Sequence, residues 1–390
     1  MNIRLQPVID FGKMPIANAF LTPERFKDEF FYRMILGYDP KTHAIGLVNT
    51  VPLEQMFHDH YAFYSSTSKG MQEHFRKTAE KLLPYAGKGT VIELGSNDGI
   101  MLEAWKDFGV KAVGIEPSAN VADVSRSLGH TVISKFMDDR VLGEIMSHGP
   151  ISLVYAANTF CQFEHLSDYV CWITAMIGAR GVLVFEDPYA LDMIEKTAYD
   201  QVYDEHVWYF TVSFINAMFE PLGYHVFDCE HIPVHGGQLR MYVGHRDTHP
   251  ARPVVSTWLE KEKNLDRQLE LFKTNIEKSK AKLLEILRKI KNEGKRVCGF
   301  GAASKGVIVT NYCGIGPDLI PFVTDNTPIK IGTYYPGSHI PVVSQDRFTK
   351  DIEYAFLFAW NHLPEIDKYF SWFRQGGGHW ITHVPTPRII

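Results

Sequence analysis

The stretch VIELGSNDGIML, residues 91–102, decides the fold class of this chain. Apolar β-forming residues lead into a short polar turn that runs from Gly95 to Gly99, and an apolar helical pattern resumes after the turn. A second strand, KAVGI (111–115), then ends on the acid Glu116. A strand, a glycine turn, a helix and a strand ending in an acid about 20 residues further on are typical of a nucleoside site at the carboxyl edge of a parallel sheet.

The turn itself, with Ser96, Asn97 and Asp98 between its two glycines, differs from the G-x-G-x-x-G of dinucleotide-binding proteins. It has no close pair of glycines to approach a pyrophosphate, and an acid, Glu93, stands just before it. An acidic, polar loop suits a ligand that carries a positive sulfonium and an amine. The alternative interpretation is an ordinary turn between a strand and a helix, with a helix cap.

Both parts of this pattern resemble the first two motifs of class I S-adenosylmethionine methyltransferases. The resemblance implies that residues 95–99 contact the methionine end of S-adenosylmethionine and that Glu116 holds the ribose hydroxyls. It also adds Glu93, Pro117 and Phe136 to the cofactor site.

Composition describes an ordinary globular protein. The 390 residues are 45% hydrophobic and 22% charged, and this length suits two or three domains. A net charge of −5 gives no general attraction for nucleic acid or an anionic membrane, and no apolar run approaches the length of a membrane span. Because the first 15 residues lack a secretory pattern and the five cysteines are scattered, we expect a cytoplasmic protein with reduced thiols.

Three domains are predicted from the pattern of elements. Residues 1–70 are loop-rich and form an N-terminal lobe. Residues 71–250 alternate strands with helices, which predicts a doubly wound parallel sheet with an antiparallel pair at one edge. Residues 251–390 open with a long amphipathic helical stretch over 255–291, which we interpret as a bridge between domains, and continue as a second α/β domain.

Two stretches of the central domain offer acid–base chemistry. YDEHVWYFT (203–211) places Tyr203, Glu205 and His206 within four positions, and histidine is a natural general base near neutral pH. Asn158 ends the strand ISLVYAAN, where side chains face the crevice of an open α/β sheet. A structural histidine and a capping asparagine are the alternatives.

A third stretch, GFGAASKG (299–306), looks like a phosphate-binding loop between a strand and a helix. Backbone N–H groups at the helix start, with Ser304 and Lys305, suit an anionic phosphate. Asp325 ends the following strand, so the segment also imitates a dinucleotide site. A tight structural turn is the alternative.

Together these stretches resemble the sugar C-methyltransferases that act on nucleotide-linked keto-deoxysugars. The similarity covers nearly the whole chain and is carried by FGKMPIANAFL (11–21), HDHYAFYSSTS (58–68), VIELGSNDG (91–99), YDEHVWYF (203–210), HGGQLRMYV (235–243), GFGAASKG (299–306), NYCGI (311–315) and TYYPGSHIPV (333–342).

The resemblance assigns roles to individual residues. His206 is the base that deprotonates the sugar carbon, and Tyr203, Glu205 and Asn158 surround the reacting sugar. Tyr64 closes over the sugar from the N-terminal lobe. The residues that bind the nucleotide sugar are completed by Arg240, Ser304, Lys305 and Asn311.

One departure concerns metal. Members of this family commonly carry paired zinc-binding cysteines in the N-terminal lobe, but no cysteine precedes Cys161 here. His43, His58 and His60 offer neither the spacing nor the thiolates of a structural zinc site. We therefore expect no zinc, and a lobe held by apolar packing of residues such as Phe30, Phe31, Tyr32 and Phe57.

The predicted function is S-adenosylmethionine-dependent methylation at C3 of a nucleotide-linked 4-keto-6-deoxyhexose, because enolisation next to the ketone supplies the nucleophilic carbon. The alternatives are a sugar O-methyltransferase, an NAD-dependent oxidoreductase that uses residues 299–306 with Asp325, and a non-catalytic nucleotide-sugar binding protein. The sequence leaves the nucleotide, the sugar and the oligomeric state open.

Overall fold

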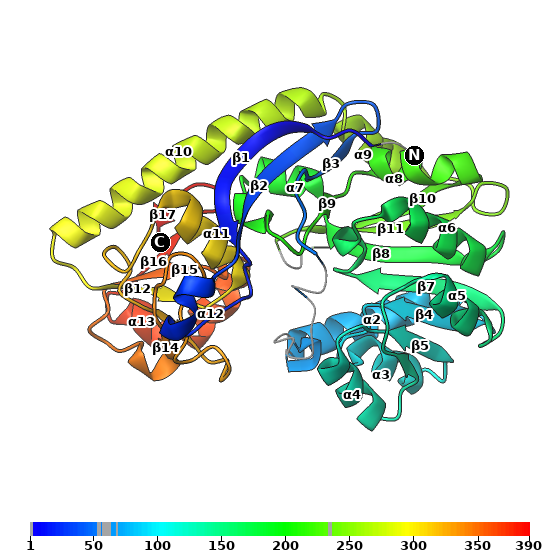
Figure 1. The fold of residues 1–390 in the computed structure, drawn as a ribbon, viewed down its shortest axis with the longest axis horizontal. Coiled ribbons are helices and arrows are strands. Elements are labelled where there is room, and N and C mark those ends of the chain that lie inside the picture. The colour runs from blue at the N-terminus through cyan, green and yellow to red at the C-terminus, as the bar shows by residue number, and fades with distance from the viewer. Residues whose placement is uncertain (1–2, 53–55, 57–63, 68, 233–235) are drawn as a thin grey trace.

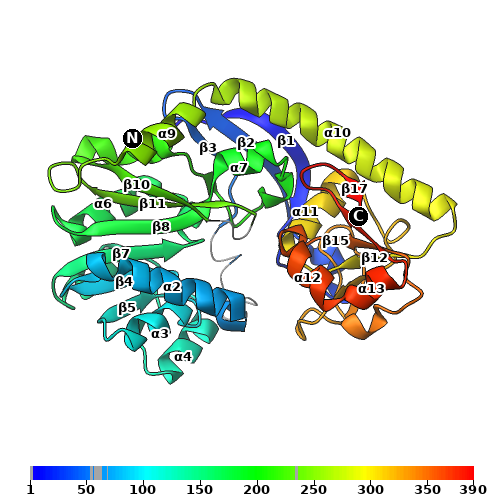
Figure 2. The same ribbon diagram turned by 180° about the vertical axis from the view of Figure 1, so that it is seen from behind.

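Three β-sheets organise the molecule in the computed structural model, which describes residues 3–52, 56, 64–67, 69–232 and 236–390. Figures 1 and 2 show the central sheet on one side of the molecule and the C-terminal sheet on the other. The N-terminal strands arch over both, so that the three parts face a common interior.

The N-terminal sheet is antiparallel and has the strand order β1-β2-β3-β9. Its strands are β1 (Gln6–Pro15), β2 (Phe31–Asp39), β3 (Ala44–Leu47) and β9 (Trp208–Tyr209). The last strand therefore comes from the central part of the sequence. Gly46 permits this pairing, because a Cβ atom at that position would lie 2.7 Å from the ring of Trp208.

Packing holds this sheet, and of the aromatic residues that the sequence suggested, Tyr32 is partly buried against the core. Phe30 is 43% exposed and Phe31 is 42% exposed, so the prediction that they pack inside the lobe is wrong. Phe57 lies outside the described residues. Most of the core is formed by fully buried aliphatic side chains of the strands, which include Met34, Leu36, Ala44 and Ile45. Strand pairing decides which side chains face the interior, and the local aromatic content of the sequence does not show which ones these are.

The central sheet has seven strands in the order β10-β11-β8-β7-β4-β5-β6. Pairing is parallel from β8 to β6, and β11 runs antiparallel to both of its neighbours. The strands are β4 (Thr90–Leu94), β5 (Ala112–Ile115), β6 (Val132–Ile133), β7 (Ile151–Ala157), β8 (Val182–Pro188), β10 (Tyr224–Ile232) and β11 (Gln238–His245). The predicted doubly wound sheet with an antiparallel edge is confirmed.

Helices cover both faces of the central sheet. Because side chains alternate along a strand, Val91 of β4 packs with α2 and α3, whereas Ile92 and Leu94 belong to the cluster that contains α5, α6 and α8. The helices are α2 (Lys69–Ala86), α3 (Ile100–Asp107), α4 (Ala119–Ser127), α5 (Asp139–Met146), α6 (Leu166–Ile177), α7 (Ala190–Glu195) and α8 (Val212–Phe219). All five residues of β4 are buried, as expected for the centre of a parallel sheet.

The C-terminal sheet has six strands in the order β14-β13-β12-β15-β16-β17, parallel except for β17. Its strands are β12 (Val297–Phe300), β13 (Val323–Asp325), β14 (Val342–Ser344), β15 (Tyr354–Leu357), β16 (His379–Thr382) and β17 (Arg388–Ile389). The helices of this region are α11 (Ser304–Cys313), α12 (Leu363–Tyr369) and α13 (Ser371–Gln375).

A long helix connects the central and C-terminal regions. After α9 (Pro253–Lys261), α10 (Leu265–Asn292) runs for 28 residues along the outer edge of the molecule (Figures 1 and 2). Its buried positions recur every three or four residues, from Leu265 to Ile290, and they join the hydrophobic cluster that contains residues of all three sheets. Among the helices in the described part of the chain, none combines the length and apolar content that crossing a membrane requires.

Candidate active site

A cavity of about 450 Å³ lies where the three regions meet. The carboxyl ends of β4, β5, β7 and β8 form its floor, and Ile16, Asn18 and Ala19 reach it from the segment after β1. The segment after β12 and the segment after β15 close it from the C-terminal region. The site therefore occupies the edge at which open α/β sheets bind their ligands.

The glycine turn lines one end of this cavity. Gly95 has a φ of 70°, and a Cβ atom there would lie 2.1 Å from Oγ1 of Thr159, so only glycine fits. Asn97 also adopts the left-handed conformation, with a φ of 47°. Gly95, Ser96 and Asn97 all line the cavity, as predicted for a cofactor loop.

Two acids lie beneath the same end. Glu116 lines the cavity while its carboxylate accepts the N–H of Asn97 (3.0 Å) and of Ser118 (2.8 Å). Burial, with Glu116 and Asp98 nearby, raises the pKa of Glu93, and its Oε2 atom finds no hydrogen-bond donor in the described part of the chain. Buried polar atoms are normally satisfied, so an unsatisfied oxygen facing a cavity fits a ligand that carries donors.

Two of the predicted cofactor residues do not belong to the described lining of the cavity. Pro117 and Phe136 line the cavity, but Asp98 and Gly99 are not among its described lining residues. Asp98 accepts the N–H and the hydroxyl of Ser66, the latter at 2.6 Å, and Gly99 is the N-cap of α3. These two residues therefore contribute to the conformation of the glycine turn and not to the described lining of the cavity.

The segment before α2 lies over the turn. Ser65 donates its N–H to Oδ1 of Asn97 at 3.0 Å and lines the cavity. Tyr64 accepts a hydrogen bond from the side chain of Asn120 at 3.0 Å, and it does not line the cavity as far as the described residues define it. The predicted contact of Tyr64 with the sugar stays a prediction.

The four predicted catalytic residues, Asn158, Tyr203, Glu205 and His206, all line the same cavity. The hydroxyl of Tyr203 lies 3.0 Å from Nε2 of His206. Glu205 accepts a hydrogen bond of 2.6 Å from the side-chain amide of Asn18. Asn158 has a φ of 51°, a conformation that non-glycine residues rarely adopt and that is common at functional sites.

Hydrogen bonds keep Asn158 in this conformation. Its N–H donates to the carbonyl of Glu186 at 2.7 Å, and its side-chain oxygen accepts from the amide of Gln238. Because both partners are in neighbouring strands of the sheet, the side chain is fixed at the edge of the cavity.

Buried charges surround the catalytic cluster. Burial raises the pKa of Glu205 and of its neighbour Asp204, which accepts the N–H of Ala17 at 2.9 Å. Burial also lowers the pKa of Lys330, although the charges of Asp325 and Glu205 oppose that shift. Burial therefore shifts the pKa values of all three groups toward their neutral forms.

The wall from the C-terminal region carries positive charge. Ser304 and Lys305 line the cavity as predicted, at the start of α11. Asn311 does not belong to the described lining; its amide donates to the carbonyls of Val307 (2.8 Å) and Pro336 (2.9 Å), so it holds the neighbouring turn.

Several lining residues were not predicted from the sequence. They are Asn18, Gln162, Gln201, Lys330, Asn361 and His362. Asn18 lies within a stretch that supported the family resemblance, which was the only signal for it. The others lie in short 3-10 helices or, for Lys330, in a turn, none of which carries a motif, and only the tertiary fold brings them to the cavity.

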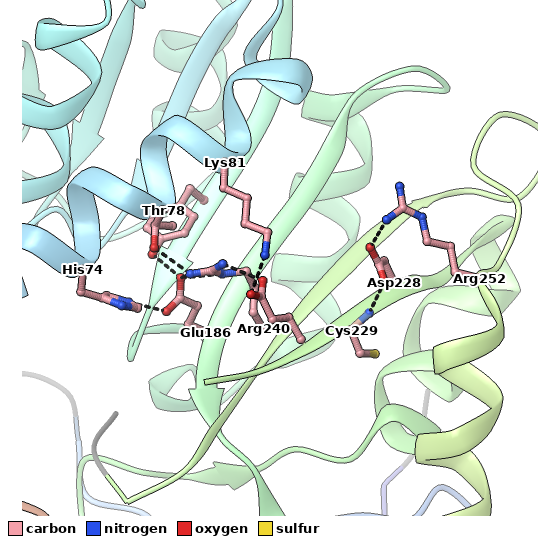
Figure 3. A network of polar contacts seen from close by, with 10 residues as sticks. His74, Thr78, Lys81, Glu186, Asp228, Cys229, Arg240 and Arg252 are labelled. Carbon is pink, nitrogen blue, oxygen red and sulfur yellow. Dashed lines mark hydrogen bonds and ion pairs between the residues drawn. The ribbon is translucent and has the colours of Figure 1, made fainter. Parts of the chain in front are cut away.

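Arg240 requires a correction, since it is 3% exposed and absent from the described lining of the cavity. Its guanidinium lies 2.7 Å from the carboxylate of Glu186 and donates a hydrogen bond to Thr78, and Figure 3 shows these three side chains together. The guanidinium also lies 2.9 Å from the carboxylate of Glu230. His74 of α2 lies on the other side of Glu186 at 2.8 Å. Arg240 thus ties α2 to the sheet and does not approach a substrate.

Metal-binding side chains do not gather in the part of the chain that the structure describes, where no group of three acids, histidines or cysteines is arranged to hold an ion. His43 contacts the hydroxyl of Tyr38 through Nδ1 at 3.0 Å. His58 and His60 lie outside the described residues. The absence of zinc stays a prediction.

Comparisons with known proteins agree with this geometry. Residues 68–228 match the family model of a methyltransferase domain, and residues 233–385 match that of a C-methyltransferase C-terminal domain. C-methyltransferase NovU from Streptomyces niveus is 29% identical over 394 residues, which cover 98% of this chain and 94% of that protein.

Solved structures resemble only part of the chain. Magnesium protoporphyrin IX methyltransferase (ChlM) from Synechocystis PCC 6803 with bound SAM has a TM-score of 0.35 and 10% identity, over 45% of this chain and 80% of that one. A SAM-dependent methyltransferase from Archaeoglobus fulgidus has a TM-score of 0.33 and 16% identity, over 41% and 71%. The two family models and NovU carry the assignment: the chain is an S-adenosylmethionine-dependent methyltransferase whose C-terminal part matches the model of a C-methyltransferase C-terminal domain.

Proposed function

We propose that this enzyme methylates C3 of a nucleotide-linked 4-keto-6-deoxyhexose after base-assisted enolisation. The observation that carries the proposal is the pair of Tyr203 and His206, 3.0 Å apart, in the same cavity as the glycine turn and Lys305. A base, a cofactor loop and a cationic wall around one space suit a substrate with a reactive ring at one end and phosphates at the other.

The glycine-turn end suits the methyl donor. Glu93 and Ser96 each present a buried oxygen that lacks a hydrogen-bond partner within the described structure. Asn97, Glu116 and Phe136 complete this end of the cavity. When bound there, S-adenosylmethionine supplies an electrophilic methyl group on a positively charged sulfur.

His206 acts as the base. Its imidazole takes the proton from the sugar carbon next to the ketone, and the hydroxyl of Tyr203 orients the ring through the hydrogen bond at Nε2. With S-adenosylmethionine held at the glycine turn, the enolate carbon would form a bond to the methyl group as the methyl–sulfur bond breaks, and S-adenosylhomocysteine would leave while the ketone forms again. His206 then passes its proton to solvent.

Charge that develops on the ketone oxygen needs donors. The hydroxyl of Tyr203 and the side-chain amide of Asn158 face the cavity from two different segments, and such preorganised donors stabilise an oxyanion. Glu205 adjoins them and is held by Asn18, which fits a role in orienting the sugar hydroxyls.

The cationic wall suits the nucleotide. Lys305 and Lys330 both line the cavity, and Ser304 begins α11, whose N-terminus favours negative charge. A diphosphate between sugar and nucleoside would place its two charges against this wall.

The test uses a reaction that precedes methyl transfer. In deuterated water, the wild-type enzyme is expected to exchange the proton next to the ketone of a nucleotide 4-keto-6-deoxysugar, as measured by mass spectrometry. His206→Ala is expected to lose about 100-fold or more in this exchange and in turnover while binding both ligands normally. Tyr203→Phe is expected to show a milder loss.

Product analysis with a panel of nucleotide sugars completes the test. A methyl group found on carbon C3 supports the proposal, whereas a methyl ether contradicts it and identifies an O-methyltransferase. Normal proton exchange by His206→Ala would place the base elsewhere, with Tyr203 and Glu205 tested next.

A further inference from the structure

Asp200 joins the central region to the C-terminal region from a buried position. It lies in the short 3-10 helix Tyr199–Gln201, three residues before Tyr203, and its side chain is fully buried. Its Oδ2 atom accepts the indole N–H of Trp360 at 2.7 Å and lies 3.2 Å from Nε2 of His383. Both partners belong to the C-terminal region.

The partner Trp360 supports a lysine of the cavity wall. The Nζ atom of Lys305 lies 5.2 Å from the centroid of the Trp360 ring, a cation–π distance. Trp360 begins the short helix Trp360–His362, whose next two residues, Asn361 and His362, line the cavity beside Lys305. Asp200 therefore holds in place the Trp360 ring that Lys305 contacts.

Charge ties the same residues together. Burial on its own would raise the pKa of Asp200, but His383, Lys305 and Trp360 together hold that pKa below its ordinary value. Burial lowers the pKa of Lys305, and the negative charge of Asp200 opposes that shift. A buried lysine needs such a counter-ion, because an isolated ammonium group is costly to remove from water.

We propose that Asp200 is a positioning residue that keeps Lys305 charged and directed toward the phosphates of the substrate. This inference rests on the proposed function, since it requires a substrate with phosphates. Asp200 itself is absent from the described lining of the cavity, whereas its neighbour Gln201 lines it, so Asp200 acts through Lys305.

Calorimetry with dTDP, GDP and CDP, and with the corresponding nucleosides, tests this inference on the full-length protein. The wild-type enzyme is expected to bind at least one diphosphate. Asp200→Asn is expected to weaken that binding about tenfold, because the lysine loses its counter-ion, and to leave binding of the nucleoside and of S-adenosylmethionine unchanged.

Asp192 offers a matched control. It also pairs with a lysine and a histidine, Lys196 at 2.7 Å and His231 at 2.8 Å, but it lies outside the described lining of the cavity. Asp192→Asn is expected to leave diphosphate binding unchanged, so a loss in that variant as large as in Asp200→Asn would overturn the inference.

A second background separates positioning from a structural role. In Lys305→Met, the further change Asp200→Asn is expected to cause no additional loss of diphosphate binding. An equal loss in both backgrounds would overturn the inference. Should Asp200→Asn fail to fold, Trp360→Phe removes the indole donor and keeps a ring, and it is expected to weaken diphosphate binding about threefold.

The two proposals fail in different ways. If the wild-type enzyme binds S-adenosylmethionine but none of the diphosphates, the proposed function is contradicted. If it binds a diphosphate equally well in the wild type, in Asp200→Asn and in Trp360→Phe, only the role of Asp200 is contradicted.

Discussion

Glu116 combines two tasks in one carboxylate, since it ties the glycine turn to the next strand and lines the cavity. Glu116→Ala is expected to weaken S-adenosylmethionine binding by about 1.5–3 kcal/mol, as lost hydrogen bonds to a charged group do. Calorimetry with S-adenosylmethionine measures this change, and an unchanged dissociation constant would contradict the assignment of this end of the cavity.

The control for Glu116 comes from the second sheet domain. Asp325 ends β13 and accepts the N–H of Ala302 (2.5 Å) and of Thr327 (2.7 Å), the same pattern of contacts around a different glycine loop. Asp325→Ala is expected to leave S-adenosylmethionine binding unchanged. A comparable loss in both variants would mean that Glu116 acts through general stability.

Asp187 gives the protein a pH dependence of known sign. Burial raises its pKa to about 8, and the neighbouring Cys161 only partly offsets that shift. The folded protein therefore holds this proton at pH values where the unfolded chain releases it, so the stability contributed by the protonated acid is lost as pH rises from about 4 to about 8.

Asp187→Asn replaces this carboxyl group with an amide that does not titrate. The thermal midpoint of the variant relative to wild type is expected to rise steadily from pH 5 to pH 8, and differential scanning calorimetry measures it. Asp123→Asn, at an acid whose side chain is 70% exposed, serves as the control and is expected to show no such trend. A difference for Asp187→Asn that stays constant with pH would contradict this account.

At the scale of elements, the sequence correctly predicted the features that residues adjacent in the sequence determine, such as where strands end. The strands that end at Leu94 and Ile115 were predictable because apolar runs stop at a glycine turn and at an acid. The function of Arg240 was not, because its partners Glu186 and Thr78 are 54 and 162 positions away in the sequence. A charged residue in a strand looks the same whether it faces a ligand or a buried carboxylate.

The contacts of Arg240 with Glu186 and Thr78 predict that this residue contributes strongly to stability. Arg240→Ala leaves the buried Glu186 without its main counter-ion and is expected to lower the free energy of unfolding by about 3–5 kcal/mol. Urea unfolding measures this loss. Lys81, also on α2, forms an ion pair with Glu230 of β10, but its side chain is 51% exposed. Lys81→Ala is therefore expected to lower the free energy of unfolding by only about 0–1 kcal/mol. Similar losses in the two variants would contradict a structural role specific to Arg240.

At the scale of the whole molecule, the cavity exists only because three regions meet. Asn18 contacts Glu205 across 187 positions of sequence, and Lys330 adds its charge from the C-terminal region. No local pattern predicts such a meeting, so the sequence motifs predicted the glycine turn and the residues around His206 but not most of the other residues that line the cavity. The predicted boundaries at residues 70 and 250 stay a proposal, because β9 of the N-terminal sheet comes from residues 208–209.

The same joining of regions explains how the N-terminal sheet keeps its shape. Its buried side chains belong to the hydrophobic cluster that extends into the other two sheets. Glu29 adds a polar link, since its carboxylate accepts the N–H of Gly337 at 2.6 Å and lies 2.8 Å from Nε2 of His339. Phe26 stacks on His339, with 3.7 Å between ring centroids.

Such a sheet is expected to be stable without a metal ion. No cysteine precedes Cys161, and a closed structural zinc site needs four nitrogen or sulfur ligands. Elemental analysis of the purified protein is therefore expected to find zinc well below one ion per chain, and incubation with a chelator is expected to leave the thermal midpoint unchanged. Finding one tightly held zinc per chain, with a lower midpoint after chelation, would contradict this prediction. Glu29→Gln, by contrast, is expected to lower the midpoint, because it weakens the link on which we infer that the sheet depends.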